Sequence, residues 1–229
     1  MRRHRESAPS LLAIPEGASD SLIPTPAWAR PGAPFWAWYR LVLGGTALLH
    51  LASGVAILAL SKGADFPVRI CSTYTVWSNN SRSVAHRYEG TASPMGLVAT
   101  FFFLSFAFQM MPVFAYRWYA LMVQQGVQPL RFIEYSASSS VMVVLILLLE
   151  GVTDLWTLLL LVATNASVML FGALQEQTTW LAKKLEAAGG PRPRWSALLP
   201  HACGWVPFLF EWSVLTALFE RSIAASPGT

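Results

Sequence analysis

Long apolar runs dominate the chain and are separated by polar or charged connections. A helix needs about 20 mostly apolar residues to cross a bilayer core about 30 Å thick, at a rise of about 1.5 Å per residue. Five runs approach or reach that length, and they cover residues 38–60, 94–116, 132–149, 155–174 and 198–219. Backbone polar groups in lipid must be hydrogen-bonded within their own segment. The pattern therefore predicts five transmembrane helices.

Composition places the chain in the same class. Of its 229 residues, 54% are hydrophobic and only 12% are charged, whereas a soluble domain carries about 25% charged residues. We therefore expect an all-α integral membrane bundle whose main partner is the lipid bilayer. The net charge of +4 comes from residues that flank the apolar runs. This placement favours anionic lipid headgroups over nucleic acid as their partner.

The regions outside the apolar runs divide the chain further. Residues 1–35 contain six prolines together with charged and small polar residues, so they are predicted to form a disordered arm. Leu11 to Ile14 is too short an apolar stretch for a cleaved signal peptide. Residues 36–220 are expected to form the transmembrane domain, and residues 221–229 are expected to form a tail.

Basic residues predict the orientation. Arginines precede the first run, Arg117 and Arg131 bracket the second connection, and Lys183 and Lys184 begin the fourth. These regions lie on one side of the membrane, and the positive-inside rule makes that side, with the N terminus, cytoplasmic.

The connection over residues 61–94 has a different character. Residues 69–77 read RICSTYTVW, which is rich in β-branched and aromatic residues, and a turn-prone Ser-Asn-Asn-Ser follows. This order predicts a small exposed β-hairpin. The triplet Asn79-Asn80-Ser81 also matches the acceptor pattern for N-glycosylation.

A carboxylate opens the third apolar run. Glu134 begins a stripe that continues with Ser138 and Met142, so a hydroxyl lies one turn below the acid on the same helix face. That stripe is typical of an enclosed polar pocket. The alternative is that Glu134 pairs with Arg131 on the same helix and reaches the membrane interface.

Other polar groups also fall at membrane depth. They include His50, Asn165, His201 and Glu211. Ser, Thr and Asn side chains commonly join helices in membranes, which is one explanation for Asn165. An ionised Glu211 needs a partner, a water path or a proton. Both a protonated structural role and a proton-handling role are therefore open for it.

No familiar catalytic or metal-binding pattern accompanies these groups. The sequence lacks HExxH, GxSxG, P-loop and paired CxxC motifs, so we expect neither an enzyme nor a metal site.

Three segments carry a family resemblance. RFIEYSASSSVMVVLI from Arg131, NASVMLFGALQE from Asn165 and LLPHACGWVP from Leu198 together resemble heliorhodopsins, which are retinal-binding membrane photoreceptors with a cytoplasmic N terminus. The resemblance implies that Glu134 is the counterion of a protonated retinal Schiff base. It places Ser138, Met142 and Asn165 in or near the retinal pocket. It also places His50 in a polar cluster where Gln109 stands for a family histidine.

The same resemblance shows one large departure. Heliorhodopsins have seven helices and hold retinal through a lysine in the seventh, whereas this chain matches five of them and its lysines are Lys62, Lys183 and Lys184, all in predicted connections. We therefore expect a truncated gene model, an isoform or a degenerate paralogue of a light-sensing or signalling protein. We expect it not to be photoactive alone, and its signalling partner is unknown.

The residues are also compatible with two other functions. One is a membrane interaction protein, expected to form a homodimer through the serine-rich face of the third span and through Gly44, Gly45 and Gly54. The other is a proton-conducting protein that uses Glu211 together with Glu134.

Overall fold

Five long helices make up most of the protein. The computed structural model describes residues 34–78, 81–191 and 198–225. The long helices are α1 (Pro34–Leu60), α2 (Pro94–Phe114), α4 (Pro129–Leu149), α5 (Leu155–Ala187) and α6 (Leu199–Ala225). All five are long and apolar enough to cross a membrane, which confirms the predicted helical membrane fold. The predicted arm lies almost wholly outside the described residues, as do Asn79 and Asn80 of the glycosylation pattern and the last part of the tail.

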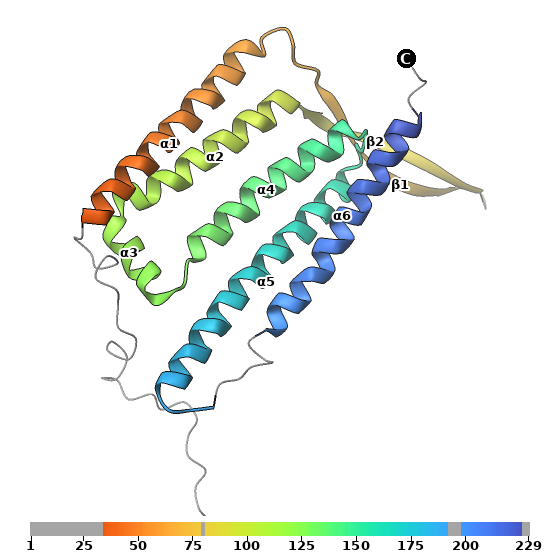
Figure 1. Ribbon diagram of the computed structural model, residues 1–229. Helices are drawn as coiled ribbons and strands as arrows, with labels where there is room; N and C mark the ends of the chain where they lie inside the picture. The colour runs from red at the N-terminus through yellow and green to blue at the C-terminus, as the bar shows by residue number, and fades with distance from the viewer. Residues whose placement is uncertain (1–33, 79–80, 192–197, 226–229) are drawn as a thin grey trace, which may run out of the picture.

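The helices stand in a row in the order α1, α2, α4, α5, α6, and each packs against the next (Figure 1). Helices α1, α4 and α6 begin at one edge of this row, which we call the Pro34 end. The strands lie at the opposite edge, which we call the hairpin end. Between 11% and 33% of the residues in the apolar part of each helix are buried. Most apolar side chains therefore point outward, as a lipid environment allows.

Local chemistry explains where the helices begin and end. Ser93 caps α2 because its hydroxyl accepts a hydrogen bond from the Gly96 N–H at 2.8 Å. Asp154 caps α5 in the same way, with the Thr157 N–H donating at 2.9 Å. Helix α5 continues to Ala187, well past the predicted end at residue 174. Apolarity marks where a span leaves the membrane, but beyond residue 174 no proline or glycine interrupts the helix until Gly189.

A short helix that the sequence did not predict fills the connection between α2 and α4. It is α3 (Tyr116–Gln125), and it ends at Gly126, whose φ of 70° is the left-handed conformation that favours glycine. Its exposed face carries Arg117, Trp118 and Leu121. Such a mixture of basic, aromatic and aliphatic side chains suits a helix that lies in the membrane interface.

The predicted hairpin is confirmed as two antiparallel strands, β1 (Val68–Ser78) and β2 (Ser81–Ala92). The register places Ile70 opposite Gly90 but Cys71 opposite Tyr88, so β2 has one extra residue, Glu89, at this point. This β-bulge divides the hairpin into an inner part beside the helices and an outer part.

Two hydrogen bonds attach the hairpin to the start of α5. The Cys71 N–H donates to the Thr153 carbonyl at 3.0 Å, and the Thr73 N–H donates to Asp154 Oδ1 at 2.9 Å. Hydrogen bonds from the backbone N–H and the hydroxyl of Thr157, followed by those from Thr73, lower the pKa of the Asp154 carboxyl below its usual value. Asp154 thus holds the helix and the hairpin together.

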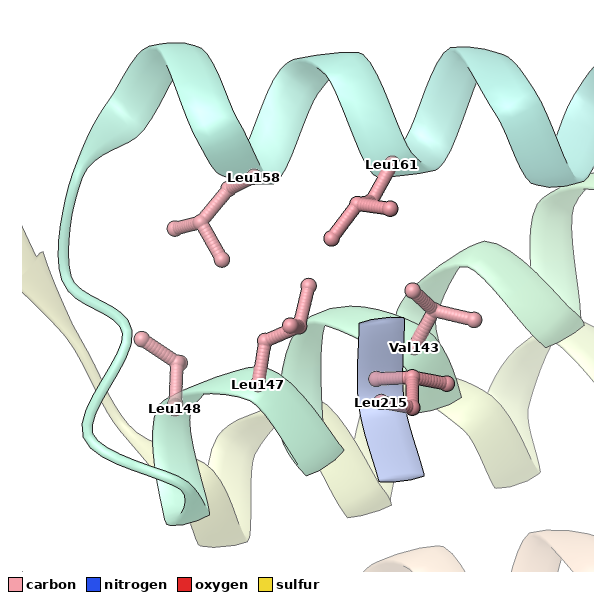
Figure 2. Packing of buried hydrophobic residues seen from close by; sticks show 6 residues of the cluster. All are labelled: Val143, Leu147, Leu148, Leu158, Leu161 and Leu215. Carbon is pink, nitrogen blue, oxygen red and sulfur yellow. The ribbon is translucent and has the colours of Figure 1, made fainter. Parts of the chain in front are cut away.

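A cluster of aliphatic side chains closes the hairpin end. Leu147 and Leu148 of α4 point toward Leu158 and Leu161 of α5, with Leu215 of α6 alongside (Figure 2). These five side chains are between 0% and 4% exposed. Lipid is as apolar as leucine, so close packing contributes more here than exclusion of water does.

Candidate functional site

Glu134 lies on α4 and is half-buried. Its carboxylate is close enough to His50 and to Tyr39, both on α1, to interact with them electrostatically. The side chain therefore belongs to the region between α4 and the first two helices. Within the described residues, Glu134 forms no hydrogen bond or ion pair.

The alternative of a pair between Arg131 and Glu134 is not what the structure contains. Arg131 Nη2 lies 3.3 Å from Glu176 Oε1 on α5. The Gln128 N–H donates to the other oxygen of Glu176 at 2.7 Å. Arg131 therefore pairs with Glu176 and not with Glu134, and this ion pair connects the start of α4 to α5.

His50 and Gln109, which were predicted to share a polar cluster, are in direct contact. His50 Nδ1 lies 3.1 Å from Gln109 Oε1, and an amide oxygen can only accept, so His50 Nδ1 is the donor. The His50 ring also packs on Phe102, with ring centroids 5.8 Å apart. The cluster therefore joins α1 to α2 on the side toward Glu134.

Two contacts nearer the Pro34 end were not found from the sequence. The Tyr39 hydroxyl donates to the Tyr119 hydroxyl at 3.3 Å, and Arg40 Nε donates to the Val113 carbonyl at 2.9 Å. The two partners in each contact lie on different helices, so no spacing along the chain would have revealed them.

Asn165 and Ser138 are both nearly buried, at 6% and 7% exposed, but Asn165 bonds to other serines. Its Nδ2 donates to Ser139 Oγ at 2.6 Å and to Ser140 Oγ at 3.1 Å. Asn165 therefore joins α5 to α4, as polar residues often do in membranes. The run Ser138-Ser139-Ser140 was the available signal for these contacts. Met142 is half-buried one turn beyond Ser138 on the same stripe.

Glu211 is the most deeply buried acid in the described part of the chain, at 3% exposed. It lies on α6 in a stripe with Gly204, Phe208 and Leu215, at spacings of four, three and four residues that put them on one helix face. Gly204 and Leu215 contact α5 or its neighbours. Glu211 therefore faces the bundle, and it forms no hydrogen bond or ion pair with any described residue.

An apolar cavity of about 290 Å³ lies among α4, α5 and α6. Phe132 forms its wall on α4, Gly172 on α5, and Gly204 and Trp205 on α6. A Cβ atom at Gly172 would lie 2.6 Å from the Phe132 ring, and one at Gly204 would lie 3.1 Å from Phe171. The two glycines therefore allow aromatic rings to sit against the helix backbones. The cavity suits a flat apolar group.

These features define a multi-pass helical membrane protein with ionisable groups held between its helices. The Heliorhodopsin family model matches residues 39–227, so the chain belongs to the heliorhodopsin family and the resemblance is confirmed. No match was found among curated proteins.

Membership implies retinal binding in general, and the residues fit that ligand only in part. The cavity can accept an apolar ring, and Glu134 is a carboxylate without a cation bonded to it. The lysines, however, lie outside the apolar part of the helices: Lys62 follows α1, and Lys183 and Lys184 are about two turns beyond Glu176 on α5.

Proposed function

We propose that this protein is a heliorhodopsin-type photoreceptor or signalling protein in which Glu134 faces the positive charge of a retinal Schiff base. The contact between Arg131 and Glu176 supports this role most directly, because it leaves the half-buried carboxylate of Glu134 without its nearest cation. When bound, retinal supplies the absorption of visible light. The lysine positions support the further proposal that this chain alone does not attach retinal covalently.

Neighbouring residues would assist Glu134 in distinct ways. His50 would hold or accept a proton near the carboxylate, while Gln109 would orient the His50 ring by accepting the hydrogen bond from its Nδ1. Ser138 and Met142 would line the same helix face as Glu134. Asn165 would fix the distance between α4 and α5 through its bonds to the serines.

We also propose that the Pro34 end faces the cytoplasm. Arg40, Arg117, Arg131, Lys183 and Lys184 all lie at this end, in addition to the arginines that precede α1 in the sequence. This excess of basic residues supports the orientation through the positive-inside rule.

Spectroscopy tests both parts of the proposal. All-trans-retinal added to the purified chain should give no red-shifted band that hydroxylamine removes, because no lysine is placed to attach it. A preformed retinal Schiff base of a small alkylamine should be held protonated, and hence red-shifted, by the Glu134 carboxylate. The shift should be lost in Glu134→Gln and kept in the control Glu150→Gln. An unchanged spectrum in Glu134→Gln would exclude Glu134 as the counterion.

Glu211 supports a second candidate, proton conduction, because a buried acid without a partner can exchange protons along a helix interface. Proton flux into liposomes should fall in Glu211→Gln if this reading is correct. Equal proton flux in the wild type and the variant would exclude proton conduction through Glu211.

A third candidate is a homodimer formed through small residues on α1. Gly54 is already in contact with Phe103 of α2, but Gly44 and Gly45 have nothing within 4 Å and remain open to another helix. Crosslinking of native membranes through cysteines placed at these two glycines should trap dimers. A strictly monomeric pattern would contradict the candidate.

A further inference from the structure

A hollow of about 300 Å³ with a mixed polar and apolar lining lies at the Pro34 end, between the end of α3 and the last turns of α5. It is separate from the apolar cavity and from Glu134. From α3 and the turn after it, the hollow is lined by Gln124, Gln125 and Gly126. From α5 it is lined by Glu176, Thr179, Trp180 and Lys183, whose spacing of three, one and three residues puts them on one helix face.

The length of α5 sets the depth of the hollow in the membrane. Its 33 residues span about 50 Å, whereas the hydrocarbon core is about 30 Å thick and the whole bilayer about 40–45 Å. If Leu155 stands at one boundary of the core, residues 175–180 lie in the headgroup layer at the other boundary, and Lys183 lies one turn beyond it, within reach of the layer through its long side chain. Trp180 is typical of that layer. The hollow therefore opens at the depth of lipid phosphates.

Most charged groups around the hollow already have partners. Arg131 and the Gln128 N–H occupy the two oxygens of Glu176. The Lys184 ammonium lies 4.1 Å from the centre of the Trp180 ring. Lys183 is exposed and has no partner in the part of the chain that the structure describes. The Thr179 hydroxyl donates to the Gln175 carbonyl at 2.8 Å and accepts from Gln175 Nε2 at 3.0 Å. The hollow thus presents one uncommitted cation, Lys183, at its rim, together with the exposed amide of Gln125.

We propose that this hollow binds the headgroup of an anionic phospholipid whose headgroup is a polyol, such as glycerol or inositol. The Gln125 amide can donate to and accept from neighbouring hydroxyl groups, and a tryptophan ring packs on the C–H face of a polyol. The Lys183 ammonium binds the phosphate as a point charge. A cavity of this volume is at the small end of ligand sites, which suits a headgroup whose acyl chains remain in the bilayer.

Native mass spectrometry of the full chain in detergent tests the proposal. Dioleoyl phosphatidylglycerol, phosphatidic acid and phosphatidylcholine are offered at equal concentration. The wild type should retain phosphatidylglycerol most, phosphatidic acid less and phosphatidylcholine least. Lys183→Gln should bind phosphatidylglycerol about fivefold more weakly, near the low end for a charged hydrogen bond because Lys183 is exposed. Lys62→Gln, at the opposite end of the molecule, should bind as the wild type does.

A second variant separates recognition of the polyol from attraction of the charge. Gln125→Ala should weaken binding of phosphatidylglycerol but leave phosphatidic acid unchanged. Inorganic phosphate added in excess should not displace the lipid, whereas displacement would show a site for free phosphate and overturn the proposal. Equal retention of the three lipids, or unchanged binding in monodisperse Lys183→Gln, would also overturn it. If Lys183→Gln does not remain monodisperse, Lys183→Arg, which keeps the charge, must bind phosphatidylglycerol within twofold of the wild type, and a larger loss would overturn the proposal.

Discussion

The two ends of the helix row are held together by different chemistry. At the hairpin end, aliphatic side chains such as Leu147 and Leu158 pack without water or charge. At the Pro34 end, the ties are polar or aromatic: Tyr39 to Tyr119, Arg40 to Val113, and Arg131 to Glu176. Close packing depends on shape alone, whereas polar ties also depend on protons, salt and hydration.

The difference indicates which end can respond to a signal. Packed cores resist small displacements, while polar contacts near the membrane surface are exchanged for contacts with water at little net cost. We therefore expect the hairpin end to be the fixed end and the Pro34 end to move. Glu134 lies on α4 one turn from Arg131, so a change in its charge would reach the moving end directly.

The largest effect is expected from Leu147→Ala at the fixed end. Leu147 is 0% exposed, so the change should leave a cavity and lower the free energy of unfolding by about 2–5 kcal/mol. Thermal and denaturant unfolding in detergent would measure it. Leu149→Ala, at a site 57% exposed, is the matched control and should change stability by less than about 0.5 kcal/mol. Equal effects of the two variants would mean that the cluster does not fix this end.

Crowding of the apolar cavity should cost less. Gly172→Ala brings a methyl group against the Phe132 ring, which must move, so we expect a loss of about 1–2 kcal/mol in the same unfolding measurement. The control is Gly45→Ala, where nothing lies within 4 Å. There the better helix propensity of alanine should stabilise the protein by up to about 1 kcal/mol. If both variants were stabilised, the contact with Phe132 would not limit the size of the side chain at position 172.

Asp154 tests the attachment of the hairpin. Asp154→Ala removes the cap of α5 and the acceptor for Thr73, so we expect a loss of about 1–2 kcal/mol. The pKa of this carboxyl is lowered in the folded protein. Its contribution is therefore complete above the unfolded-state pKa of about 3.9 and is lost as the pH falls through the lower folded-state pKa.

The wild type and Asp154→Ala should accordingly differ in stability at neutral pH and converge below about pH 4. Unfolding curves collected across that range would measure this, and Asp154→Asn, which can still cap, should lie between them. A constant difference at every pH would show that the charge of Asp154 is not involved.

The smallest effect is expected at the moving end. Arg131 and Glu176 are partly exposed, with 45% and 18% of their side-chain surfaces accessible, so their coupling in a double-mutant cycle with Arg131→Gln and Glu176→Gln should be about 0.5–1 kcal/mol and should fall with added salt. A coupling free energy above that range that does not change with salt would show that the ion pair behaves like the aliphatic contacts of the hairpin end. The two ends would then not differ in this respect.

Run lengths and turn residues were enough to predict much of the fold. The five spans follow from the requirement for about 20 apolar residues, and the hairpin follows from the alternation around Thr73 and the turn-prone residues after Ser78. Helix α3 was missed because ten amphipathic residues form too short a segment to register as a span. The sequence did not show that α5 continues past the span predicted to end at residue 174, because hydropathy reports the solvent around a helix and not the length of the helix.

The contacts of the site could be predicted only where they are local. The stripe of Glu134, Ser138 and Met142 follows from helix periodicity. The partner of Arg131 does not, because Glu176 is 45 residues away and lies on another helix. The same holds for Asn165, which bonds to Ser139 and Ser140 and not to Ser138. Which residue on a helix face meets a given neighbour depends on how the helices are rotated against each other.

The extra residue at Glu89 makes the outer hairpin sensitive to length. Side chains alternate between the two faces of a strand, so one added or removed residue beyond Cys71 would exchange the face that shows Trp77 with the face that shows Val76. A change of two residues would lengthen or shorten the strand but leave each side chain on the same face. Natural variants of this loop should therefore differ by even numbers of residues within each strand beyond Thr73, while the part of β1 up to Thr73, which bonds to the start of α5, keeps a constant length.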